Sequence, residues 1–239
     1  MKQKSYKMTA ILLHLYYQDL WEEFKEKILP LLSDSVHLYV TTTEDTEIIR
    51  DIKCHAKEVF IVENRGADFG GFIWAYKLIK NKNYDFFLKV HSKKSLHNGD
   101  LGIIWRKKLT EVFFSDKDSF EKILVTMKKD SNIFMAGAYS CFFDRQREPL
   151  HSHFHLQNKE TLKKLDSFLN ISNHGCFFAG SMFMVSKKYL ELLFKNVNLD
   201  TLYYSFDGEY SVECSLQHAF ERMIGYGVDF YNGKFLIID

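Results

Sequence analysis

The chain has 239 residues, of which 46% are hydrophobic and 16% aromatic, and its formal net charge at pH 7 is +1. This length and composition suit one large α/β domain, and the near-zero charge argues against a nucleic acid as partner. No apolar run reaches the roughly 20 residues that span a bilayer, and the four cysteines form no CxxC pair. We therefore expect a cytoplasmic protein, and peripheral association with a membrane assembly complex at the inner face of the membrane is left open.

Apolar runs and amphipathic patterns alternate through the first hundred residues. Strands are predicted at residues 8–15, 36–41, 59–62 and 86–90, with helices between them at 17–32, 42–54 and 72–80. Strand–helix alternation of this kind is typical of βαβ units and a parallel sheet. Such sheets bind ligands with the loops at the carboxyl ends of their strands, so the first half is expected to bind a ligand there.

The second half is less regular. Helices are predicted at residues 101–114, 119–129, 159–169, 188–194 and 206–224, a strand at 133–137, an apolar stretch at 176–185, and one or two short strands within 228–238. No repeat or linker divides the chain. We predict one α/β domain over residues 1–239 with a mainly parallel central sheet and flanking helices.

Basic side chains gather where the fourth predicted strand ends, in the sequence YDFFLKVHSKKS at residues 84–95. Lys89 lies just inside the end of the strand, and His91, Lys93 and Lys94 follow it. These basic residues are in position to face a ligand. Many nucleotide-sugar transferases have Asp-x-Asp there, holding a divalent ion that neutralises a diphosphate. Here His91-x-Lys93 keeps the spacing with basic groups, so the protein itself can supply the charge. The alternative is a solvated basic turn.

The loop at residues 64–71, NRGADFGG, follows a strand and opens a helix. Its glycines permit tight turns, and the helix N-terminus offers free N–H groups to an anion. Arg65 can hold a phosphate in a bidentate manner, and Asp68 can accept from a ribose or sugar hydroxyl. Asp68 as a simple helix N-cap is the alternative.

Glu209 and Glu213, four residues apart, are expected on the predicted helix 206–224. There they would lie together at the edge of an apolar stripe made by Val212, Leu216, Ala219, Phe220 and Met223. A partly desolvated carboxylate in that place can act as a base, and we favour Glu209, although two solvated surface acids are an equal alternative. His218 and Arg222 project from nearly the opposite side of this helix.

Three alternating histidines, His151, His153 and His155, would share one face if they lay on a strand, which is a plausible metal arrangement. Pro149 precedes them and no cysteine is near. A loop that binds no metal is therefore favoured.

Taken in order, several strings resemble the rhamnan synthesis protein F family of bacterial polysaccharide glycosyltransferases. They are HLYYQDLW, LYVTT, NRGADFGGF, LKVHSKKS, IWRKKL, FFAGSMF and HAFER, spread between about residues 11 and 224. The family's loop more often reads NRGRDIGPF, so Ala67 and Gly71 depart from it at positions that bear on phosphate binding.

The resemblance implies a GT-A-like fold and transfer of a sugar, such as rhamnose or another capsular or O-antigen sugar, from a nucleotide donor to a growing glycan. It assigns residues 1–100 to the nucleotide sugar and residues 101–239 to the acceptor and catalysis. It also draws attention to acceptor-side positions, namely Trp105, Gly180, Ser181, His218, Glu221 and Arg222.

We expect a metal-independent glycosyltransferase with no cofactor beyond its nucleotide-sugar substrate and with a glycan or lipid-linked glycan as acceptor. Glu209 or Glu213 would be the base. The donor would be held by Asn64, Arg65, Gly66, Asp68, His91, Lys93, Lys94 and Ser95. The alternative function is a non-catalytic carbohydrate-binding or scaffolding subunit of a polysaccharide assembly.

Overall fold

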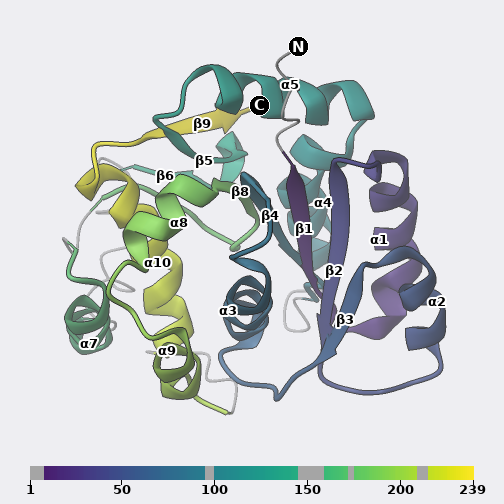
Figure 1. Cartoon of the computed structure of the whole chain (residues 1–239), viewed down its shortest axis with the longest axis horizontal. Coiled ribbons are helices and arrows are strands. Elements are labelled where there is room, and N and C mark those ends of the chain that lie inside the picture. Colours follow the sequence, from purple (N-terminus) through teal and green to yellow (C-terminus); the bar gives the residue numbers. More distant parts are fainter. Residues whose placement is uncertain (1–7, 95–99, 145–158, 172–174, 209–214) are drawn as a thin grey trace.

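The computed structural model describes residues 8–94, 100–144, 159–171, 175–208 and 215–239 (Figure 1). The residues predicted as the catalytic base, Glu209 and Glu213, lie outside these ranges, as do Ser95 and the three histidines of residues 151–155.

Residues 8–94 form four strands that alternate with helices. In chain order these are β1 (Thr9–His14), α1 (Trp21–Ile28) between the short 3-10 turns η1 (Gln18–Leu20) and η2 (Leu29–Leu31), β2 (Val36–Thr42), α2 (Ile48–His55), β3 (Glu58–Ile61), α3 (Ala67–Ile79) and β4 (Phe86–His91). All four predicted strands are confirmed.

The described residues of the second half add helices and shorter strands. They are α4 (Asp100–Phe114), α5 (Lys117–Lys129), β5 (Ile133–Ala138), η3 (Tyr139–Cys141), β6 (Phe142–Phe143), α7 (Lys159–Leu169), β7 (Phe177–Phe178), β8 (Phe183–Ser186), α8 (Lys187–Leu193), α9 (Leu199–Ser205), α10 (Leu216–Phe230) and β9 (Lys234–Ile238).

Strands from both halves share one seven-stranded sheet, in the order β3-β2-β1-β4-β8-β5-β9. Its neighbours are parallel except at β8, which runs antiparallel to both β4 and β5. The antiparallel pair β6–β7 forms a small separate sheet. The predicted α/β class, a mostly parallel central sheet with flanking helices, is confirmed.

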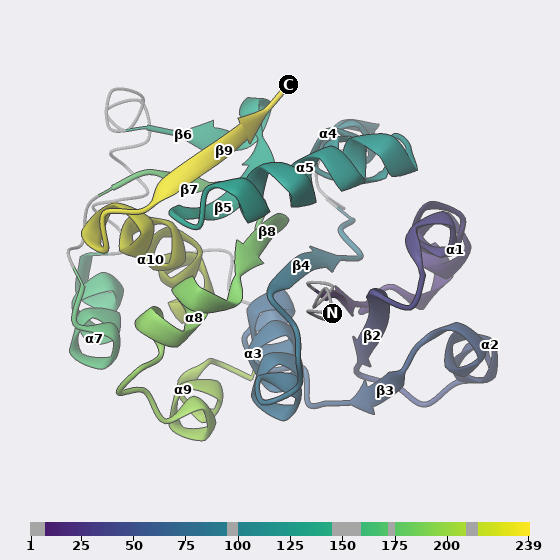
Figure 2. The ribbon, with the colours of Figure 1, turned by 45° about the horizontal axis from the view of Figure 1, so that its top comes forward.

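Helices cover both faces of the sheet (Figures 1 and 2). Side chains alternate along each strand, so β1, β2 and β4 contribute to two separate cores. The core beneath α3, α8, α9 and α10 takes in Leu12 and Phe87, whereas the core beneath α1, α2, α4 and α5 takes in Leu13 and Leu88. Strands buried on both faces explain the nearly continuous apolar runs in the first half.

One predicted helix, at residues 206–224, is wrong at both ends. The backbone is extended at Phe206, which ends α9, and again at Ser215, so α10 begins only at Leu216. The helix then continues past Gly225 and Gly227 to Phe230, because both glycines are packing positions. A Cβ on Gly225 would overlap Phe177, and one on Gly227 would overlap the Tyr189 hydroxyl.

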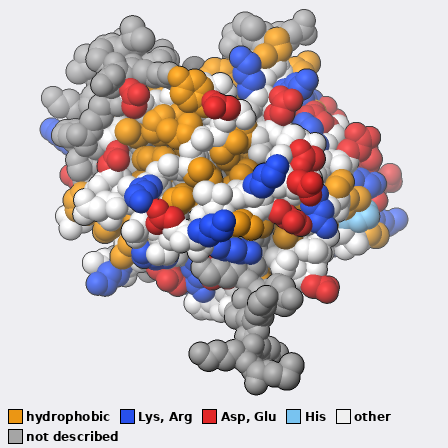
Figure 3. All heavy atoms as spheres, turned by 90° about the horizontal axis from the view of Figure 1, so that it is seen from above, with side chains coloured by type: hydrophobic (Ala, Val, Ile, Leu, Met, Phe, Trp, Pro, Cys, Tyr) orange, Lys and Arg blue, Asp and Glu red, His pale blue; other side chains and the backbone are white. Residues whose placement is uncertain are grey.

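Figure 3 views the end of the molecule where β9 and α5 lie, and it shows hydrophobic side chains gathered on that face. The large apolar side chains exposed on these two elements are Ile237 of β9 and Val125 of α5. In the part of the chain that the structure describes, no helix combines the length and apolar character needed to cross a bilayer.

Candidate functional site

The two-residue period of the strands directs three polar side chains toward the start of α3. His14 ends β1 and His91 ends β4, and the two are register partners in neighbouring parallel strands. Lys89 lies two residues before His91 and so shares its face of the sheet. Since α3 begins at Ala67 beside these strand ends, Asp68 in its first turn meets all three at the carboxyl edge of the sheet.

A buried ion cluster, formed by Asp68, Lys89 and His91, results from this arrangement. The Lys89 ammonium donates to Asp68 Oδ2 and to the carbonyl oxygen of Ser181, the latter at 2.7 Å. His91 Nδ1 lies 3.2 Å from the same carboxylate oxygen. Lys89 is 1% exposed and His91 6%, whereas the Asp68 side chain keeps 19% of its surface in contact with solvent. Lys89 and His91 therefore hold the Asp68 carboxylate from its buried side, and the rest of the carboxylate faces solvent.

Burial sets the protonation states in this ion cluster. It lowers the pKa of His91 and of Lys89, although Asp68 opposes both shifts. Burial also acts to raise the pKa of Asp68, but the neighbouring His91 and Lys89 outweigh it and hold that pKa well below its usual range. The arrangement is an ionised Asp68 paired with an ammonium, with a neutral His91 donating through Nδ1. Burial lowers the pKa of His14 to about 4, so that ring is neutral as well.

Asp68 is not the helix N-cap, so the alternative interpretation of that residue is wrong. The cap position belongs to Gly66, whose backbone is left-handed (φ 65°), and α3 starts five residues before the predicted Phe72. Gly70 and Gly71, which suggested a turn, lie inside the helix. A Cβ on Gly71 would overlap the His14 ring and crowd the Thr41 hydroxyl, which itself lies 3.0 Å from His14 Nδ1. These glycines let α3 approach the sheet closely.

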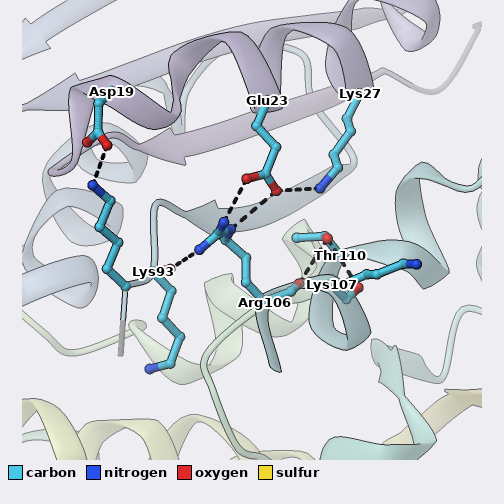
Figure 4. A network of polar contacts seen from close by, with 8 residues as sticks. Asp19, Glu23, Lys27, Lys93, Arg106, Lys107 and Thr110 are labelled. Atoms are coloured by element: carbon cyan, nitrogen blue, oxygen red, sulfur yellow. Dashed lines mark hydrogen bonds and ion pairs between the residues drawn. The ribbon is translucent and has the colours of Figure 1, made fainter. Parts of the chain in front are cut away.

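Lys93 and Lys94, beyond β4, have different surroundings. Lys94 is ion-paired with Asp19, at one end of the network in Figure 4. The Lys93 side chain points away from that network and shows no contact there, and its ammonium makes no hydrogen bond or ion pair within the described part of the chain. Its charge nevertheless acts to lower the pKa values of Lys89, His91 and His218, so it lies near the ion cluster.

Arg106 of α4 fixes the backbone at Lys93. Its guanidinium donates to both carboxylate oxygens of Glu23, at 3.2 and 2.7 Å, and to the carbonyl oxygen of Lys93 at 2.5 Å (Figure 4). Arg106 is buried, and so this bidentate contact is shielded from solvent. Arg106 lies within the string IWRKKL, and no local pattern in the sequence marks it for this role.

Arg65 is already engaged by the protein. Its Nη1 donates to the carbonyl oxygens of Phe206, at 2.6 Å, and Tyr204, at 3.3 Å, and the N–H of Gly66 donates to the carbonyl oxygen of Asp207 at 3.0 Å. The loop of residues 63–66 is thus tied to the chain just before residue 209. Asn64 is exposed beside it.

On the side of the second half, a strained turn faces the ion cluster. Gly180 and Ser181 both have left-handed backbones, with φ of 85° and 59°. Glu221 of α10 holds the turn, because its Oε1 accepts from the Gly180 N–H at 2.7 Å and from the Ser181 hydroxyl at 2.9 Å. Lys89, which donates to the Ser181 carbonyl, links this turn to Asp68.

The other residues predicted on the acceptor side surround this turn. A Cβ on Gly180 would lie 2.8 Å from Trp105 Nε1, so the indole packs directly on that glycine. His218 Nδ1 lies 2.6 Å from the Ser215 hydroxyl, and burial lowers the pKa of His218 although Glu221 opposes it. Arg222 donates to the His218 carbonyl oxygen at 2.7 Å and lies over the Phe177 ring.

The structure therefore brings Asp68, Lys89, His91 and Lys93 together with Ser181, Glu221 and His218 at one edge of the sheet. Lys94 and Arg65 are held to either side. Two members of this neighbourhood, His14 and Arg106, went unrecognised in the sequence. The alternation that places Lys89 and His91 on one face also places Leu12 and His14 there, and that signal would have found His14.

A cavity of about 200 Å³ lies elsewhere, at the far end of α3. It contains none of the predicted site residues. Its lining consists of Tyr76, Lys80, Asn81, Leu190, Glu191, Phe194 and Leu199.

Comparison with known families gives a match to rhamnan synthesis protein F over residues 1–230. The chain belongs to the rhamnan synthesis protein F family. This is a glycosyltransferase-like family, as the motifs suggested. Two curated relatives, both described as uncharacterized protein WxcX of Xanthomonas campestris pv. campestris, are 31% identical over 103 residues. The match covers 41% of this chain and only 14% of those relatives' length.

Among solved structures, this family member is similar to core-mannan synthase A from Aspergillus fumigatus in its Mn/GDP form. The similarity covers 98% of this chain and 74% of that one, with 12% sequence identity and a TM-score of 0.48. A similarity this distant carries no inference about activity.

Proposed function

We propose that this protein is a glycosyltransferase that moves a sugar from a nucleotide donor to a growing surface polysaccharide, and that it binds the donor diphosphate at the end of β4 without a divalent metal. The observation that carries the proposal is Lys93. Its backbone is fixed by Arg106, its ammonium is unpaired within the described residues, and it lies near the ion cluster. A cation without a protein partner at the carboxyl edge of the sheet is suited to a phosphate.

Negative charge develops on the nucleoside diphosphate as the bond between the sugar C1 and the phosphate oxygen breaks. A cation already held in place stabilises that charge without reorganisation, which is how such groups contribute to catalysis. In the proposed reaction the acceptor oxygen forms the new bond to C1, the diphosphate leaves with the electron pair, and Glu209 or Glu213 takes the acceptor proton. The glutamate has this role as base if the reaction inverts the sugar configuration.

Asp68 is proposed to accept a hydrogen bond from a ribose or sugar hydroxyl. Its Oδ2 is held by Lys89 and His91, and part of the carboxylate is exposed. His91 would then serve the donor by orienting Asp68 rather than by touching phosphate. We expect His91→Ala to weaken nucleotide binding roughly tenfold.

Independence of metal is supported by the surroundings of the same carboxylate. A divalent cation needs several oxygen ligands, and Asp68, the acid beside the end of β4, offers it only one free oxygen, because its Oδ2 already accepts from an ammonium and an imidazole. We propose rhamnose or another capsular or O-antigen sugar as the transferred group, on the strength of the family alone.

The test is a panel of nucleoside diphosphates screened by thermal shift, with and without EDTA. Stabilisation by one diphosphate that survives EDTA is the expected result, because a ligand that binds only the folded state raises its melting temperature. Binding that disappears with EDTA would contradict metal independence. If no diphosphate binds at millimolar concentration, a non-catalytic carbohydrate-binding or scaffolding subunit replaces the transferase.

A further inference from the structure

Three consecutive large apolar side chains are exposed at the start of α4. Ile103, Ile104 and Trp105 have 57%, 49% and 43% of their surface in contact with solvent. Single exposed apolar residues are ordinary, but several on one short segment mark a surface that contacts another apolar phase.

The two isoleucines cannot turn inward. The opposite face of α4 is buried through Arg106, Leu109, Thr110 and Phe113, and Arg106 is bonded to Glu23 of α1. The Thr110 hydroxyl donates to the Arg106 carbonyl oxygen at 2.9 Å, within the same turn of the helix. The orientation of α4 is therefore fixed. Ile103 and Ile104 are held outward, and Trp105 lies at the edge of this face, where part of its indole packs on Gly180.

Lysines accompany the apolar residues on this face. Lys107 follows Ile103 and Lys108 follows Ile104 by one turn of the helix, and both are exposed. Figure 4 shows the Lys107 side chain pointing away from the Glu23–Arg106 contact. The acid on the same face is Glu111, a further turn along. Apolar side chains bordered by cations match a surface with an apolar interior and anionic headgroups.

We propose that the outer face of α4, formed by Ile103, Ile104, Trp105, Lys107 and Lys108, docks on the surface of an anionic lipid bilayer. The isoleucines and the indole enter the headgroup boundary, where Trp is favoured, and the lysines contact lipid phosphates. This mode of binding needs no membrane-spanning helix.

The position of α4 also bears on how the acceptor reaches the protein, and this part of the inference rests on the proposed function. Trp105 packs on Gly180, whose turn is linked through Ser181 and Lys89 to Asp68. A bilayer held against α4 therefore adjoins the region proposed to bind the acceptor. An acceptor glycan anchored to a lipid in that bilayer would be presented to it.

Co-sedimentation with vesicles tests the proposal. The wild-type protein should bind vesicles of phosphatidylglycerol and phosphatidylcholine, bind pure phosphatidylcholine far less, and lose affinity in high salt. Ile103→Ser/Ile104→Ser should lower the partition coefficient about tenfold or more. Lys107→Glu/Lys108→Glu should do the same and remove the salt dependence.

The controls make comparable changes on α5, one apolar residue and two lysines. Val125→Ser alters an apolar residue of similar exposure, 45%, and Lys128→Glu/Lys129→Glu reverses two exposed lysines. Both controls should bind as the wild type does. Equal binding to neutral and anionic vesicles, or unchanged binding by the α4 variants, would overturn the proposal. So would a wild-type protein that binds neither vesicle, in which case the α4 face serves a protein partner.

Nucleotide binding by the same variants separates this inference from the proposed function. Ile103 and Ile104 are exposed on the outer face of α4, whereas the ion cluster is held together by buried polar contacts, so the diphosphate affinity should stay at the wild-type value. Diphosphate binding without vesicle binding defeats the membrane proposal alone. Vesicle binding without any diphosphate binding defeats the transferase proposal and leaves the docking surface standing.

Discussion

The two halves of the chain build the carboxyl edge of the sheet by different means. Residues 8–94 supply polar groups from regular positions, at the ends of β1 and β4 and the start of α3, and bury them as an ion cluster. The described part of residues 100–239 supplies a left-handed turn held by Glu221. The first half thus depends on charge pairing in the interior, and the second on a strained backbone held by a few hydrogen bonds. We expect mutations in the two halves to have different costs.

The largest loss of stability is expected in the first half. Lys89→Met leaves the Asp68 carboxylate without its ammonium partner and should lower the free energy of unfolding by about 3–5 kcal/mol. Replacing both partners, in Asp68→Asn/Lys89→Met, should restore part of that loss because no uncompensated charge remains. Urea unfolding measures both variants.

Lys94→Met is the matched control for Lys89→Met, since Lys94 pairs with the exposed Asp19 at the surface. It should change stability by no more than about 1 kcal/mol. If Lys89→Met costs no more than Lys94→Met, the buried ion cluster does not support the first half.

A pH effect of nearly the same size is expected from His14. The unfolded chain takes up a proton at this residue near its ordinary pKa of 6.5, whereas the folded protein takes it up only near pH 4. Folding is therefore penalised as the pH falls from about 6.5 to 4, by up to about 3 kcal/mol. His14→Gln should reduce the slope of stability against pH in that window. Equal slopes for His14→Gln and the wild type would refute this assignment.

Mutations in the two halves should also affect different steps of the proposed reaction. Glu209→Gln or Glu213→Gln should lower kcat roughly a hundredfold and leave nucleotide affinity nearly intact, because the base acts on the acceptor rather than on the donor. Measuring kcat and nucleotide affinity for each variant decides between them. Two variants that turn over at the wild-type rate would remove both candidates for the base.

A smaller effect is expected at the turn of the second half. Gly180→Ala places a Cβ against Leu109 and Trp105 on a residue with φ of 85°, and should cost about 2 kcal/mol. At Gly208 a Cβ would meet Arg65 alone among the described residues, at 3.9 Å, so Gly208→Ala should be nearly neutral. Thermal unfolding of the two variants compares them, and similar melting temperatures would show that the turn is not under strain.

The same contrast explains which features could be predicted from the sequence. Strand period and apolar runs predicted β1 to β4 and the cations at the end of β4, because those features depend on local patterning. The glycines misled the prediction at Gly70 and Gly71. They were interpreted as part of a tight turn, whereas Gly71 allows close packing of α3 on the sheet, as Gly225 and Gly227 allow close packing of α10. Only the packed fold distinguishes those two uses of glycine.

Contacts between residues far apart in the sequence could not be predicted from it either. Arg106 reaches back to Glu23 and Lys93, and Glu221 reaches the turn at Gly180, with no local pattern to mark either. The sequence showed Lys89, His91, Lys93 and Lys94 as one basic group. The fold separates them, because Lys89 and His91 are buried with Asp68 and Lys94 is paired with Asp19. Among the described residues, the Lys93 ammonium has no hydrogen bond or ion pair.

That separation is the central claim, and isothermal titration with the preferred nucleoside diphosphate in EDTA tests it most directly. Lys93→Ala should weaken binding about tenfold or more, because it removes a charge-assisted contact to the diphosphate. Lys94→Ala, one residue further on, should stay within about threefold of the wild type, because its ammonium is engaged with Asp19. Equal losses in the two variants, or no loss at Lys93, would contradict the claim.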